Sequence, residues 1–224
     1  MRGAWEEAGC AVIKKREKEM ADELSEKLLR YAPQTLAGIK TGSIFNIHDI
    51  AVGMLELEIA VLNSKLNPMD IYIERVQSKK GNSLIYVYRK QQLIRDLEDP
   101  TARKLLWYKG YPFVGADADT ILYGRIEHLK ERLTDYDCFP HEIGLFLGFP
   151  VEDVKAFIEK DGHDCLTCGF WKFYCNKSQA LETFRQYKIC ARIYNEAADL
   201  KIPVTRMTVN LRNVDISRGY RKAS

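Results

Sequence analysis

The sequence predicts an α+β fold in which helices pack on a small antiparallel or mixed β-sheet. Two features favour this class. Several long segments repeat apolar residues every three or four positions, as helices do, whereas other short segments are aromatic and β-branched and are bounded by turn residues. The 224 residues are 46% hydrophobic and 29% charged, which supplies enough apolar side chains for a core.

The first half of the chain is expected to begin with helices. Apolar residues recur on one helical face from Glu17 to Tyr31, and Pro33 ends this helix because a proline disfavours helical geometry in the residue before it. A second helix is predicted over 50–66, with Asp49 as its N-cap residue. Its high apolar content predicts deep burial of Val52, Leu55, Leu57, Ile59, Val61 and Leu62.

Three short strands are predicted in the same half. Residues 43–47 form an extended piece. Residues 71–76 and 84–88 are rich in β-branched and aromatic side chains, and a polar connection with a glycine, 78–82, joins them. This pattern indicates an antiparallel hairpin.

The other predicted elements are mostly helical. Pro140 and Pro150 each suit the first turn of a helix. The aromatic run from Phe170 to Cys175 is typical of a strand. Helices are predicted over 90–97, 101–108, 120–133, 140–147, 150–158 and 178–200, and strands over 170–175 and 202–211.

The chain is interpreted as one domain with two short extensions. Residues 1–16 form a charged N-terminal extension, 17–211 a single α+β domain, and 212–224 a basic tail. Segments 17–112 and 119–200 share a helix–strand–helix order, which indicates a possible pseudo-repeat. A duplication would place the aromatic strands of both halves side by side in one sheet, with the helices on one face.

Composition excludes several classes of function. The net charge of +3 gives no support for a nucleic-acid partner, and the basic tail is expected to be solvated surface. No apolar run approaches the roughly 20 residues that span a bilayer, and the N-terminal residues lack the order of a signal peptide. We therefore expect a cytoplasmic protein with no membrane partner, whose six cysteines are mostly free thiols. The sequence has no Walker loop and no GxGxxG, HExxH or GxSxG motif, and it leaves the cofactor and the oligomeric state open.

Four stretches carry a resemblance to a known family. They read APQTLAGIKTGSIFNI, SLIYVYRKQQL, FPHEIGLFLGFPVEDVKAFIE and GFWKFY. Together they resemble a family of uncharacterised bacterial proteins known only as a domain of unknown function, number 3793, from about Ala21 to Leu200. The family has no established activity, so the resemblance implies relatedness and no catalytic residue or cofactor.

Pro140, His141 and Glu142 form the first candidate site. A histidine beside a carboxylate at the start of a helix suits acid–base chemistry or ligand capture. The structural alternative is that Glu142 interacts with the helix dipole while His141 packs locally, because adjacent residues on a helix do not face each other.

The GFWKFY run is the second candidate site. In a strand, Trp171 and Phe173 share one face while Lys172 and Tyr174 share the other. An amine and a phenol on one face suit a planar or anionic ligand. The alternative is an ordinary sheet covered by helices, with the lysine at its rim.

His163, Cys165, Cys168 and Cys175 form the third candidate site. The spacing of Cys165 and Cys168 is the one used by zinc turns and by redox pairs. A structural zinc site needs four ligands, so His163 and Cys175 would have to complete it. Free thiols in a loop are the alternative.

The leading hypothesis is a small-molecule-binding or accessory protein with a pocket between the FPHEIG turn and the GFWKFY strand. Its candidate ligand-binding residues are His141, Glu142, Trp171, Lys172 and Tyr174. The alternatives are an enzyme that uses His141 or Glu142 as acid–base, and a zinc or thiol-redox module at Cys165 and Cys168.

Overall fold

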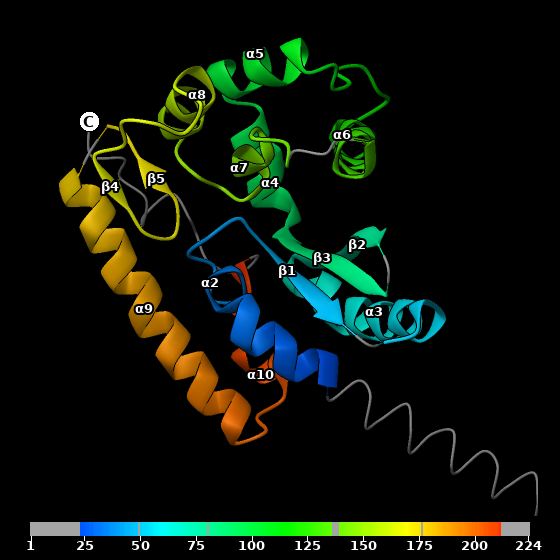
Figure 1. The fold of residues 1–224 in the computed structure, drawn as a ribbon. Helices are drawn as coiled ribbons and strands as arrows, with labels where there is room; N and C mark the ends of the chain where they lie inside the picture. The colour runs from blue at the N-terminus through cyan, green and yellow to red at the C-terminus, as the bar shows by residue number, and fades with distance from the viewer. Residues whose placement is uncertain (1–22, 49, 80, 136–138, 176, 212–224) are drawn as a thin grey trace, which may run out of the picture.

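The chain forms an α+β fold of helices around a three-stranded sheet, with a second, two-stranded sheet at one side (Figure 1). The computed structural model describes residues 23–48, 50–79, 81–135, 139–175 and 177–211. The predicted extension 1–16, the predicted N-cap residue Asp49 and the basic tail 212–224 lie outside the described residues. The predicted fold class is confirmed.

The central sheet consists of β1 (Gly42–His48), β2 (Ile71–Lys79) and β3 (Asn82–Arg89), with β3 in the middle. Both pairings are antiparallel, and the predicted hairpin is confirmed as β2 and β3. Gly81 lies between these two strands at a φ of 80°, in the left-handed region that glycine adopts without a steric cost.

Helices cover both faces of this sheet. Successive residues of β3 point to opposite faces, so Ile85 and Val87 enter one core while Tyr86 and Tyr88 enter the other. The first core is closed by helical residues 23–31, α2 (Pro33–Leu36), α3 (Val52–Leu66), α9 (Lys177–Asp199) and α10 (Val204–Met207). The second is closed by α4 (Lys90–Leu97), α5 (Pro100–Tyr108), α6 (Ala118–Asp135), α7 (Ile143–Phe146) and α8 (Val151–Glu159). The expectation of helices on one face is therefore wrong, because both faces of β3 are apolar and each needs a cover.

Helix α3 is less buried than its composition predicts. Leu55, Ile59 and Leu62 are buried, because this face of the helix packs against the sheet. Val52, Leu57 and Val61 are exposed, so the prediction of deep burial is wrong for these three. The helix begins at Val52, and the short 3-10 helix η1 (Asn67–Met69) connects it to β2.

The predicted strand 170–175 is much shorter than expected. Only Lys172–Phe173 is extended, as β5, and it pairs with β4 (Thr167–Cys168) in the separate two-stranded sheet. The aromatic side chains of this run pack on α9 instead of facing a long strand partner, since the rings of Trp171 and Phe173 both contact Phe184 of α9. The expectation that β5 lies beside β3 in one sheet is therefore wrong.

The predicted strand 202–211 is also wrong. Residues 204–207 form α10, in which Val204 is buried in the first core and Met207 packs against it. The Thr208 hydroxyl donates to the Val204 carbonyl at 2.8 Å.

Arg89 holds this C-terminal segment to the sheet. Its side chain is fully buried, and its guanidinium donates to the carbonyls of Thr35, Leu36 and Val209 at 2.7, 2.7 and 2.8 Å. The backbone N–H of Val209 also donates to Leu36 at 3.0 Å. Backbone carbonyls from two distant parts of the chain thus depend on one side chain.

The other predicted helices are confirmed as α4, α5, α6, α8 and α9, with ends that differ by a few residues. The predicted helix 140–147 is confirmed only in part, as the single turn α7. Among the described residues, no helix combines the length and the apolar content that crossing a membrane requires.

A cavity between a helical turn and an aromatic hairpin

A cavity of about 550 Å³ lies where the segment before α7, helix α8 and the hairpin β4–β5 meet. In Figure 1 α8 lies beside the hairpin β4–β5, and α7 lies nearer the middle of the molecule. The cavity is lined by Phe139, Pro140, His141, Ile143, Gly144, Phe149, Asp153, Val154, Phe157, Cys168, Gly169, Phe170, Trp171 and Lys172. Its wall is therefore mainly apolar and aromatic, with a few polar groups.

His141 is one of the polar residues of this wall. It precedes α7, is half-buried, and its ring centroid lies 5.0 Å from that of Phe157 on α8. The buried Pro140 and Ile143 on either side anchor the backbone that carries it. The imidazole can therefore reach a molecule in the cavity.

Glu142 does not line the cavity. Its side chain is 1% exposed, pairs with Arg132 of α6 and accepts a hydrogen bond from the Tyr111 hydroxyl at 3.2 Å. Burial, and then the Glu142 charge, raise the pKa of Tyr111. His141 and Glu142 thus enter different environments, and Glu142 has the role of a buried ion-pair partner.

Trp171 forms part of the cavity wall and is held in place from two sides. Its ring stacks on Phe149 with centroids 4.8 Å apart and planes 18° apart. Its indole N–H donates to Asp153 at 3.1 Å, and the other oxygen of this buried carboxylate accepts from the Tyr174 backbone N–H at 2.8 Å. Asp153 therefore fixes both the indole and the backbone of the hairpin to α8.

Lys172 brings a positive charge to the cavity. Its ammonium donates to the Gly162 carbonyl at 2.7 Å and lies 5.6 Å from the Phe157 ring centroid. An ammonium has three donors, so this contact leaves capacity for a ligand. The Lys172 and Cys168 backbones are paired across the hairpin.

Tyr174 is separated from the other candidates. It is not among the cavity-lining residues, and its hydroxyl is buried without a hydrogen-bond partner in the described part of the chain. The Lys160 ammonium lies 5.5 Å from its ring centroid. Of the five residues predicted for the ligand site, the cavity thus brings together His141, Trp171 and Lys172, and it excludes Glu142 and Tyr174.

The cysteine motif is brought together only in part. The Sγ atoms of Cys165 and Cys168 are 2.9 Å apart, and the two thiols share a hydrogen bond. Within the residues that the structure describes, no group of three or more His, Cys, Asp or Glu side chains is arranged to hold a metal ion. His163 and Cys175 therefore do not complete a site with this pair.

Four residues of the wall lie outside the FPHEIG and GFWKFY segments and the candidate sites that the sequence indicated: Phe149, Asp153, Val154 and Phe157. As an acid in the first turn of α8, Asp153 has a position that favours the helix dipole. Its position four residues before Phe157 places both on one face of α8, and this spacing is a signal that could have indicated a shared surface. Nothing in the sequence indicated that Phe149 stacks on Trp171.

Lys40 approaches the same wall without lining the cavity. Its ammonium lies 5.1 Å from the Phe149 ring centroid. Burial lowers the pKa of this amine to about 8. An aromatic ring at this distance attracts a cation, which offsets part of the cost of burying the charge.

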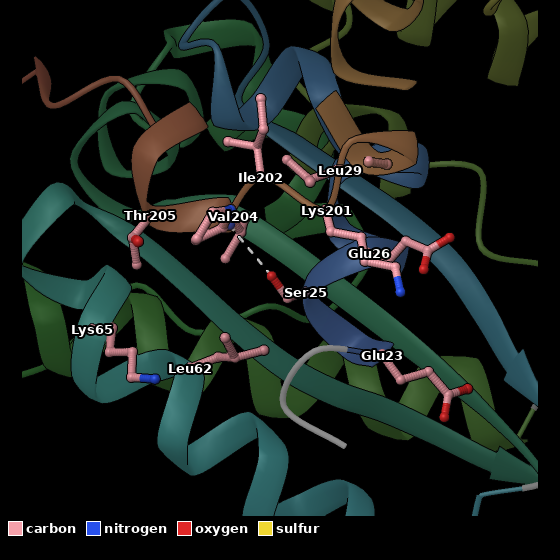
Figure 2. Close-up of a pocket in the computed structure, with 12 residues that line it drawn as sticks. Glu23, Ser25, Glu26, Leu29, Leu62, Lys65, Lys201, Ile202, Val204 and Thr205 are labelled. Carbon is pink, nitrogen blue, oxygen red and sulfur yellow. Dashed lines mark hydrogen bonds between the residues drawn. The ribbon is translucent and has the colours of Figure 1, made fainter. Parts of the chain in front are cut away.

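A second hollow, of about 440 Å³, lies between the helical residues 23–31, α3 and the segment around α10 (Figure 2). The Val204 N–H donates to the Ser25 hydroxyl at 3.3 Å across it. Two acids, Glu23 and Glu26, and two lysines, Lys65 and Lys201, line it, so its charge favours neither sign of ligand. None of the candidate ligand-binding or metal-binding residues that the sequence indicated lines this hollow.

One family model matches residues 28–208, and its description is "Protein of unknown function (DUF3793)". No curated protein and no solved structure matches the chain.

Proposed function

Because this chain belongs to the DUF3793 family of proteins of unknown function, we propose a function from its site alone: the cavity binds a small, planar, anionic molecule. The observation that carries this proposal is the joint presence of His141, Trp171 and Lys172 in one largely aromatic cavity. A volume of about 550 Å³ is in the range of small-molecule sites.

The chemistry of the wall favours this class of ligand. Phe139, Phe149, Phe157, Phe170 and Trp171 offer ring surfaces on which a planar molecule can stack. The Lys172 ammonium offers a charged donor for a carboxylate or phosphate, and the His141 ring offers a second polar contact. Asp153 uses both oxygens within the protein, so the one carboxylate among the described residues of the wall is already hydrogen-bonded.

The acid–base alternative stays a prediction without a supporting observation beyond the location of His141. Glu142 pairs with Arg132, so it does not assist His141 in the cavity. A cytoplasmic location is proposed on separate grounds: the described cysteines are free thiols, which suits a reducing compartment.

The proposal is tested by calorimetric titration with small planar aromatic carboxylates and their neutral carboxamide counterparts. We expect carboxylates to bind more tightly than the amides, and Lys172→Met to weaken carboxylate binding about tenfold, near 1.4 kcal/mol. Lys160→Met is the matched control, because Lys160 carries the same charge nearby but does not line the cavity. Equal affinity for acid and amide, or equal losses in the two lysine variants, would contradict an anion site at Lys172.

Native mass spectrometry of protein purified from its own host gives an independent test. A bound molecule that dissociates from a Trp171→Ala variant, but is retained by Trp107→Ala, would support the cavity as its site. Trp107 is a suitable control because it is exposed on α5 and does not line the cavity.

A further inference from the structure

We infer that Cys165 and Cys168 are a reversible dithiol–disulfide pair that regulates the hairpin wall of the cavity. The part of this inference that concerns ligand affinity rests on the proposed function. The chemical step itself does not.

The two thiols have the placement that the reaction needs. Their Sγ atoms are 2.9 Å apart, in hydrogen-bond contact, so closing a disulfide requires only a small movement. Cys165 is half-buried and Cys168 is exposed, so a small reagent can reach the pair. Cys168 also lines the cavity, which puts the redox chemistry at the edge of the proposed ligand site.

The reaction partner is a low-molecular-weight disulfide such as oxidised glutathione. The thiolate of one cysteine of the pair attacks one sulfur of the reagent, whose S–S bond breaks as a mixed disulfide forms and one reagent thiolate leaves. The thiolate of the other cysteine then attacks the sulfur of the first cysteine and releases the second reagent thiolate. Two electrons pass from the cysteine pair to the reagent, and the two cysteine protons end on the two reagent thiols.

The hydrogen bond between the thiols holds the two sulfurs together, so either thiol can resolve a mixed disulfide that forms on the other. A variant that lacks one of the two thiols therefore traps the mixed disulfide on the remaining one.

The other described cysteines differ from this pair. Cys190 is buried in the first core, where burial raises its pKa to about 11. Cys175 is exposed, and the burial of its sulfur and the nearby Asp153 charge raise its pKa. The high pKa of Cys190 lowers its thiolate fraction at neutral pH, so this thiol reacts slowly.

Oxidation acts on the cavity through the hairpin. β4 and β5 each have only two residues, and a short two-stranded pair is marginally stable by itself. Cys168 pairs with Lys172, and Trp171 lies in the connection between the strands. A disulfide to Cys165 restrains β4, so the hairpin opens less often and the wall is better organised for a ligand.

The first experiment titrates the full-length protein with glutathione redox buffers and follows intact mass and peptide maps. We expect a 165–168 disulfide, with the loss of two hydrogens and no retained glutathione. Cys168→Ser should retain glutathione on Cys165, and Cys175→Ser should behave as wild type. Stable glutathione on both thiols, or alkylation of Cys165 and Cys168 at equal and independent rates, would overturn the inference.

The second experiment compares hydrogen exchange in the reduced and oxidised proteins. The Leu166 N–H donates to the Phe173 carbonyl at 2.7 Å, so its exchange reports hairpin opening without any ligand. Oxidation should slow this exchange in wild type but not in Cys168→Ser. Unchanged or faster exchange after the disulfide forms would refute regulation of the hairpin.

The ligand measurement separates this inference from the proposed function. If the cavity binds aromatic carboxylates, oxidation should tighten binding by about threefold or more. Absence of binding in both redox states, with the disulfide formed and exchange slowed, would refute the proposed ligand and retain the redox pair. Equal affinity in both states would refute regulation and retain the ligand site.

Discussion

Glu58 is a buried acid whose ionisation should control stability between mildly acidic and neutral pH. It lies on the inner face of α3, is 4% exposed, and its Oε2 atom has no hydrogen-bond partner in the described part of the chain. Burial raises its pKa to about 7, and the nearby Glu23 charge adds to this while Lys27 opposes it.

The direction of the effect follows from proton binding. In the unfolded chain Glu58 loses its proton near its ordinary pKa of 4.5, whereas in the folded protein it keeps it until about 7. Between these values the folded state binds more protons, so the free energy of unfolding falls as pH rises. The pKa of Glu58 differs by about 2.5 between the folded and unfolded states, and each pKa unit corresponds to 1.36 kcal/mol. The free energy of unfolding therefore falls by up to about 3 kcal/mol as the pH rises through this range. The contribution is complete below pH 4.5 and is lost above 7.

Glu58→Gln keeps the size of the side chain and removes its ionisation. Urea unfolding should be measured for both proteins from pH 4.5 to 8. As the pH rises across this range, the free energy of unfolding of the variant should increase by up to about 3 kcal/mol relative to that of wild type. Glu56→Gln on the same helix is the control, because Glu56 is half exposed and paired with Arg75 at 2.5 Å. Parallel pH profiles for wild type and Glu58→Gln would refute a buried, proton-binding Glu58.

Four further substitutions test the packing described above, each by urea unfolding. Arg89→Leu leaves buried carbonyls without their donor and should lower the free energy of unfolding by about 3–5 kcal/mol. A loss under about 1 kcal/mol would contradict the role of Arg89 in holding the C-terminal segment to the sheet. Gly169→Ala places a Cβ about 2.1 Å from the Phe184 ring, so it should lower the free energy of unfolding by about 1–3 kcal/mol. Backbone amides of the hairpin should also exchange hydrogen faster in this variant. Leu55→Ala should cost about 2–5 kcal/mol and Leu57→Ala less than about 0.5 kcal/mol, and similar losses would show that both faces of α3 are buried.

The location of the candidate site could be predicted from the sequence, but the side chains that line it could not. The glycines, prolines and aromatic runs of FPHEIG and GFWKFY indicated two segments with special geometry, and the cavity lies between them. Which side chains face it depends on how the turn before α7 is oriented in the fold. His141 enters the cavity while its neighbour Glu142 points to Arg132, and no local pattern decides between these directions.

Local sequence determined most of the helices and the β2–β3 hairpin, because their signals are short-range: apolar periodicity, prolines at helix starts and a glycine in a tight turn. Tertiary structure decided the rest. GFWKFY has the composition of a strand, yet it extends for only two residues because the rings of Trp171 and Phe173 pack against Phe149 and α9. Burial can be satisfied by any apolar neighbour, so a single sequence determines that these rings are covered, and only the fold determines what covers them.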